Sequence, residues 1–148
     1  CTDQTFTITD GKTQAAVRVV PMHPELTQVV NDLIGGRQEG WLIERLSPGG
    51  PDGKRSWNIQ KKFGREKTKL GYGPETVFHS FRMSFISKLD QTGCPPLVLK
   101  KIVGHKINDL TLGHYSSGAL LEEMRKAVQK VRMPVGGLMG MEVRADAS

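Results

Sequence analysis

The chain has little cysteine and no long apolar run, and both features limit the classes of protein to which it can belong. Cys1 and Cys94 are the two cysteines among 148 residues, and they show neither zinc-ligand nor disulfide-framework spacing. Two lone thiols suit a reducing cytoplasm, although the sequence permits one disulfide. No apolar run approaches the roughly 18 residues that a membrane span needs, and no signal peptide is recognisable. The sequence therefore predicts a cytoplasmic protein with no membrane partner.

Several common reactive motifs are also missing. The chain has no acidic cluster, no Cys/His zinc spacing and no Gly-Lys-Ser/Thr phosphate loop. We therefore expect neither a metal nor another cofactor, and a metal-dependent nuclease is disfavoured because its carboxylates are lacking. Hydrophobic residues make up 37% of the chain and charged residues 24%, a composition that suits one soluble domain.

Positive charge is concentrated in one window, from Lys54 to Leu70. Seven basic residues minus one acid, Glu66, give this window a net charge of +6, which equals the net charge of the whole chain. A patch of this size attracts a phosphate backbone, but a solvated helix face can have the same composition. The candidate DNA-binding residues are the seven basic members of the window: Lys54, Arg55, Lys61, Lys62, Arg65, Lys67 and Lys69.

The hydrophobic pattern predicts an α+β, mostly helical domain, with a hairpin first and helices after it. Residues 6–9 and 15–20, joined at Asp10-Gly11, predict a β-hairpin that ends at Pro21. Helices are expected at about 24–34, 56–70, 77–91, 96–103 and 120–131. Asn108-Asp109 can cap a short turn before Tyr115.

The same pattern predicts which side chains are buried. We expect a short buried segment at residues 41–43. The expected core positions of the later helices are Trp57, Ile59, Phe63, Phe78, Phe81, Phe85, Leu89, Leu99, Ile102, Val103, Leu120, Leu121, Met124, Val128 and Val131. We expect residues 1–133 to form the domain and residues 134–148 to form a tail, because that segment lacks periodicity.

Two histidines, one arginine and one tyrosine form a set that suits a phosphodiester. His79 and Arg82 stand at i and i+3, which are neighbours on a helix face. His105 follows a glycine at a helix end, and Tyr115 comes ten residues later. Arginine binds phosphate oxygens with a planar fork, histidine moves protons, and tyrosine is a nucleophile where neighbours offset its pKa of about 10. Taken singly, each residue could instead be a surface pair, a helix cap or a packed turn residue.

Taken jointly, these residues resemble the signature of the tyrosine recombinase (phage integrase) family, in its C-terminal catalytic domain. The resemblance covers about residues 5–133. It implies the fold of that domain, a small N-terminal antiparallel sheet packed on a helical bundle. The motifs that carry it are His79-x-x-Arg82, Val103-Gly104-His105, Thr111, Tyr115-Ser116, and Gly11-Lys12-Thr13 followed by Arg18-Val19-Val20-Pro21.

The resemblance implies a site-specific recombinase that cleaves and rejoins DNA through a 3′-phosphotyrosine intermediate. Tyr115 would be the nucleophile, and Arg82 and His105 would hold the phosphate oxygens. His79 would assist proton transfer, and Lys12 would be the general acid. The implied partner is double-stranded DNA, on which the full-length protein would form a tetramer. The implied source is a bacterial or phage-encoded mobile element that acts on host DNA.

The chain departs from the family's pattern in two ways. Met83 stands where the family often has histidine. The family's first catalytic arginine lies before the hairpin, so we expect a chain truncated before that arginine and inactive or weakly active alone. Type IB topoisomerase-like DNA relaxation and a non-catalytic DNA-binding module are the alternatives. The Gly-His motif favours a recombinase over the first, and joint retention of the five catalytic candidates argues against the second.

Overall fold

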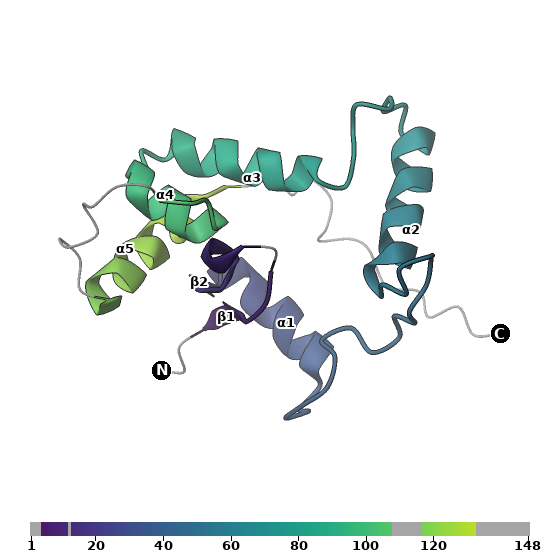
Figure 1. Cartoon of the computed structure of the whole chain (residues 1–148), viewed down its shortest axis with the longest axis horizontal. Coiled ribbons are helices and arrows are strands. Elements are labelled where there is room, and N and C mark those ends of the chain that lie inside the picture. Colours follow the sequence, from purple (N-terminus) through teal and green to yellow (C-terminus); the bar gives the residue numbers. More distant parts are fainter. Residues whose placement is uncertain (1–3, 12, 108–116, 133–148) are drawn as a thin grey trace.

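The computed structural model describes residues 4–11, 13–107 and 117–132, which form the α+β, mostly helical architecture that the sequence predicts (Figure 1). Within these ranges, none of the helices has the length and apolar character needed to cross a bilayer. In chain order the elements are β1 (Thr5–Ile8), the 3-10 helix η1 (Gln14–Ala16), β2 (Arg18–Pro21), the 3-10 helix η2 (Pro24–Leu26), α1 (Thr27–Ile34), α2 (Ser56–Lys69), α3 (Ser80–Gln91), α4 (Pro96–Val103) and α5 (Ser117–Lys130).

The predicted hairpin is confirmed, but its predicted tight turn is wrong. β1 and β2 pair antiparallel, with Thr5 opposite Pro21 and Ile8 opposite Arg18. The connection runs from residue 9 to residue 17 and contains η1, where we expected the second strand to begin. The Asp10 side chain accepts a hydrogen bond from the Gly11 amide, and η1 precedes the start of β2.

The predicted helices at 24–34 and 56–70 are confirmed as η2 with α1, and as α2. The predicted burial of residues 41–43 is wrong, because the Trp41 side chain is 63% exposed and Leu42 and Ile43 are exposed as well. Trp41 stacks instead under the guanidinium of Arg55, 4.5 Å from its ring centroid. α2 contains no buried residue, so its apolar side is only half-buried.

The hydrophobic core lies where α3, α4, α5 and β2 meet. α4 packs against α5, α3 and β2, and α5 also contacts β2 (Figure 1). α4 and α5, which the sequence predicts, supply most of this core, and the end of α3 supplies Leu89. The buried residues are Leu89, Cys94, Val98, Ile102, Val103, Met124, Ala127, Val128 and Val131. Phe85, Leu99 and Leu120 pack on them while partly buried.

The aromatic residues at and just before the start of α3 correct a second prediction of burial. α3 begins at Ser80 instead of residue 77, and Phe78 and Phe81 are exposed, Phe81 by 57%. Both rings contact Phe63 of α2, and the three ring centroids lie 5.3 to 5.7 Å apart. These residues were assigned to the core because they share a helical period with Leu89. They instead pack α2 onto α3, at a distance from the core (Figure 1).

Candidate phosphate-binding site

The end of α4 positions the Gly104-His105 motif. α4 begins after Pro95 and ends at Gly104, which adopts the left-handed conformation with φ of 74°. The amides of Gly104 and His105 both donate to the Lys100 carbonyl, at 2.9 and 3.0 Å. This is the common way to close a helix at glycine. His105 therefore leaves the helix in a fixed direction with its side chain exposed.

Arg82 comes to the same helix end from α3. Its Nη2 donates a hydrogen bond to the Val103 carbonyl, and its side chain is half-buried. His79 is the residue just before α3, and its carbonyl accepts the Arg82 amide at 3.0 Å. The structure thus brings Arg82 to the Gly104-His105 turn and places exposed His79 one turn before Arg82.

A second guanidinium, that of Arg18, approaches the same helix end from β2. Its Nε donates to the Ile102 carbonyl at 2.9 Å, and its Nη1 donates to the Ala16 carbonyl at 2.6 Å. Burial lowers the pKa of Arg18, and the positive charge of Arg82 lowers it further. The two arginines are therefore electrostatic neighbours. Within the described ranges no acid forms an ion pair with either of them.

Sequence reasoning missed Arg18 as a member of this site. The motif placed it in the hairpin, but its contact with Ile102 spans 84 residues. No local sequence pattern indicates that a strand residue contacts a helix end so far away in the chain. The only sequence signal was its membership of the Arg18-Val19-Val20-Pro21 motif.

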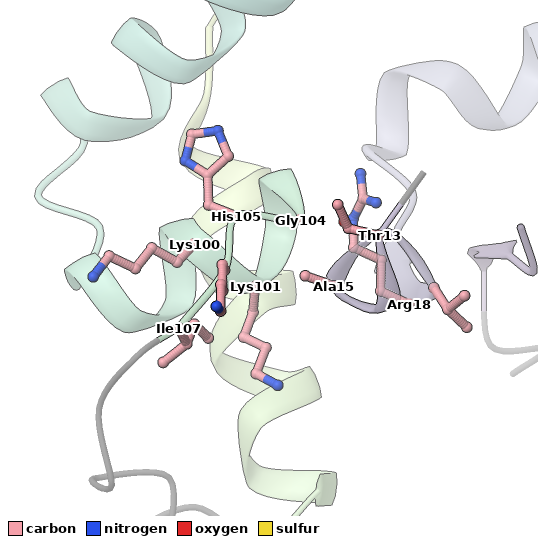
Figure 2. A pocket seen from close by; sticks show the side chains of 10 residues that line it. Thr13, Ala15, Arg18, Lys100, Lys101, Gly104, His105 and Ile107 are labelled. Carbon is pink, nitrogen blue, oxygen red and sulfur yellow. The ribbon is translucent and has the colours of Figure 1, made fainter. Parts of the chain in front are cut away.

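A pocket of about 690 Å³ lies between the hairpin and the end of α4. Figure 2 shows Thr13, Ala15 and Arg18 on one side of it and Gly104 and His105 on the other. The ionisable residues that line the pocket are all basic: Arg18, Lys100, Lys101, His105 and Lys106. Such a lining favours an anionic ligand.

Two of the predicted catalytic residues, Lys12 and Tyr115, lie outside the described residues, as do Asn108, Asp109, Thr111 and the predicted tail. The arrangement of the predicted catalytic set can therefore be given for His79, Arg82 and His105. Within the part of the chain that the structure describes, no group of three His, Cys, Asp or Glu residues could hold a metal ion.

The predicted basic window lies on α2 and the turn before it, and several of its charges already have partners. Lys54 pairs with Asp52 at 2.9 Å, and Lys69 pairs with Glu66 at 3.0 Å. The Lys67 ammonium donates to the Gly73 carbonyl at 2.6 Å.

The remaining members differ in what they contact. Besides stacking on Trp41, Arg55 donates to the Glu44 carbonyl, and Lys61 lies 4.0 Å from the centroid of the Trp57 ring. Among the described residues, none forms an ion pair with Lys62 or Arg65. The charge available to an external anion is therefore concentrated at Lys61, Lys62 and Arg65.

Comparison with known proteins found a matching family. The model of the phage integrase family matches residues 1–119 of the chain. The matched region contains the hairpin, the His79-x-x-Arg82 pair, the Gly104-His105 turn and Tyr115. Neither the curated proteins nor the solved structures contain a match.

Proposed function

We propose that this chain, which belongs to the phage integrase family, cleaves and rejoins DNA strands through a covalent link at Tyr115. One observation carries the proposal. Arg82 and the Gly104-His105 turn, which are separated in sequence, meet at the end of α4 through the hydrogen bond from Arg82 to Val103. That junction opens on a pocket lined by basic residues, which suits the phosphate of a DNA strand.

The proposed reaction needs no co-reactant. The Tyr115 hydroxyl oxygen attacks the scissile phosphorus, and the bond from phosphorus to the 5′ oxygen breaks. The products are a 3′-phosphotyrosine and a free 5′-hydroxyl. His79 takes the proton from the phenol, and Lys12 donates a proton to the leaving oxygen. Rejoining reverses these steps, because the phosphotyrosine retains the energy of the bond that was broken.

Arg82, beside the pocket, and the basic residues that line it stabilise the charge that develops in this reaction. Negative charge grows on the non-bridging oxygens in the transition state, and donors fixed in advance lower its energy. Arg82 uses Nη2 on the Val103 carbonyl, so its remaining N–H groups can meet the phosphate. His105, exposed at the pocket, donates to the same oxygens.

The duplex on either side of the scissile phosphate would contact α2. DNA carries about one negative charge per 1.7 Å of its axis, so a row of cations binds it without reading its sequence. Lys61, Lys62 and Arg65 are the members of the basic window that we expect to contribute most, because neither a carboxylate nor a carbonyl among the described residues occupies them.

The test is covalent trapping on a nicked suicide DNA substrate, from which the 5′ product diffuses away. The chain has two tyrosines, so Tyr72→Phe is a matched control for Tyr115→Phe. We expect a weak adduct with the wild-type chain and with Tyr72→Phe, because we expect this chain to be only weakly active alone, and none with Tyr115→Phe. DNA affinity should change less than about twofold in either variant, because no phosphate-binding charge is removed.

The same assay separates the alternatives. An adduct that persists in Tyr115→Phe contradicts the assignment of the nucleophile. Binding without any wild-type adduct would favour a non-catalytic DNA-binding module. Relaxation of supercoiled plasmid without strand exchange between two substrates would favour a topoisomerase.

A further inference from the structure

Arg18 connects the hairpin to the helix that carries the Gly104-His105 turn. It is the first residue of β2, and its guanidinium bonds the Ile102 carbonyl of α4 and the Ala16 carbonyl of the hairpin loop. One side chain therefore fixes the distance between these two elements. The connection between β1 and β2, residues 9–17, includes Lys12 in the sequence.

The two carbonyls held by arginine are adjacent in α4. The last four carbonyls of an α-helix have no partner within the helix, and they form its electronegative end. Arg18 bonds the carbonyl of Ile102, and Arg82 bonds the carbonyl of the next residue, Val103. The last two residues of α4, directly before Gly104 and His105, are thus held from two elements, β2 and α3.

Gly104 leaves room for Arg18. A Cβ atom at position 104 would lie 2.6 Å from Arg18 Nη1 and 2.8 Å from Arg18 Cζ, closer than a Cβ atom approaches other heavy atoms. The guanidinium therefore lies directly against the turn that orients His105 (Figure 2). Movement of Arg18 would move this turn relative to Arg82.

We propose that Arg18 is a positioning residue that holds the end of α4, and with it His105, in fixed register with the hairpin and with Arg82. This inference rests on the proposed function, because it assigns Arg18 a part in the same reaction. Arg18 acts through the Ile102 carbonyl and the Gly104 turn. Its Nε and Nη1 bond carbonyls at this helix end and in the hairpin loop, and we assign its effect on the reaction to the position of His105.

The experiment compares Arg18→Lys and Arg18→Ala with matched variants of Arg37. Arg37 also bonds a carbonyl at a helix end, that of Leu33 in α1, and a loop carbonyl, that of Trp41, but it does not line the pocket. Single-turnover cleavage of the nicked substrate is measured over a range of protein concentrations, below the melting temperature of each variant. The concentration series gives two separate quantities: the maximal cleavage rate and the protein concentration at half saturation.

We expect Arg18→Ala to lower the maximal rate by up to about 100-fold, since misplacement of a catalytic group by 1 Å can cost that much. Arg18→Lys should fall between Ala and wild type, because an ammonium can bond the Ile102 carbonyl without bridging to Ala16. Half saturation should stay within about threefold, and the Arg37 variants should cleave at the wild-type rate. A raised half-saturation point with an unchanged maximal rate would make Arg18 a DNA contact and overturn the proposal.

A second readout does not depend on catalysis. The chain has four histidines, so the imidazole NMR signals can be assigned by single substitutions. In Arg18→Lys the His105 signal should move and lose its response to added inorganic phosphate. The signal of His23, which bonds the Val131 carbonyl, should stay in place. An unmoved His105 signal overturns the proposal, whereas absence of any wild-type adduct overturns the proposed function alone.

Discussion

Replacing Gly104 by alanine should destabilise the protein more than the same change at another left-handed glycine. Gly35 and Gly104 both close eight-residue helices, with φ of 56° and 74°. A residue with a Cβ atom costs roughly 1–2 kcal/mol in this conformation, and both variants bear that cost. The two sites differ in their surroundings, so the pair separates backbone strain from steric conflict.

The steric part can be estimated from the contacts. At position 35 the nearest atom to a new Cβ is the Asp32 carbonyl oxygen, at an ordinary 3.8 Å. At position 104 the new Cβ meets Arg18 Nη1 at 2.6 Å, so the guanidinium must move and lose a hydrogen bond. A hydrogen bond to a charged group contributes about 1.5–3 kcal/mol. We expect a loss of about 2.5–5 kcal/mol for Gly104→Ala and about 1–2 kcal/mol for Gly35→Ala.

Urea unfolding followed by circular dichroism measures both losses. In an Arg18→Ala background the excess cost of Gly104→Ala should largely disappear, which gives a coupling energy between the two positions. A small part should remain, because the Ala15 carbonyl lies 3.1 Å from the new Cβ. Equal losses at positions 35 and 104, or full additivity with Arg18→Ala, would refute the account of this contact.

Three further predictions concern the core, the buried thiol and the basic helix. Leu89→Ala should lower the free energy of unfolding by about 2–5 kcal/mol, because that side chain is fully buried, whereas Leu70→Ala, at a position 73% exposed, should change it by less than about 0.5 kcal/mol. Similar losses of unfolding free energy in the two variants would contradict the assignment of Leu89 to the core. Burial, and then the charge of Asp90, raise the pKa of the Cys94 thiol against a smaller opposing effect of Lys130. The stability that this provides is present below the ordinary thiol pKa and is lost as pH rises past it. Unfolding free energy should therefore fall more steeply from about pH 8 to 10 in the wild type than in Cys94→Ala, and parallel curves would contradict this. Finally, the slope of DNA affinity against salt should fall by up to about 0.9 per lost phosphate contact when three α2 residues become alanine (Lys61, Lys62 and Arg65). Replacing the paired Lys54 and Lys69 should change it little, and an unchanged slope in the triple variant would place the DNA contact elsewhere.

Local signals in the sequence were sufficient for the elements around the site. Pro95-Pro96 and Gly104 bound α4, and Gly35-Gly36 end α1, because proline starts helices and glycine ends them for stereochemical reasons that need no tertiary contact. The Asp10-Gly11 signal fell within the connection between β1 and β2. It could not give the length of the connection, because that depends on where β2 pairs with β1.

Burial was predicted less well than helix position. A periodic pattern tells which residues share a face, but it does not tell what covers that face. Leu89 and Phe81 share a face of α3, yet Leu89 is fully buried and Phe81 is 57% exposed. The difference arises because α4 and α5 cover the end of α3, while its start contacts α2 through Phe63.

Arg18 was missed for a related reason, and the physics of the helix end accounts for its position. Two guanidiniums repel each other, and within the described ranges no carboxylate lies between Arg18 and Arg82 to offset that repulsion. The carbonyls of Ile102 and Val103 supply the missing negative potential, because a helix end carries roughly half an elementary charge. Half a charge does not balance two cations, so the end of α4 retains a positive excess beside the pocket. On the proposed function a phosphate would complete the balance, since this helix end holds both arginines and closes at the turn that carries His105.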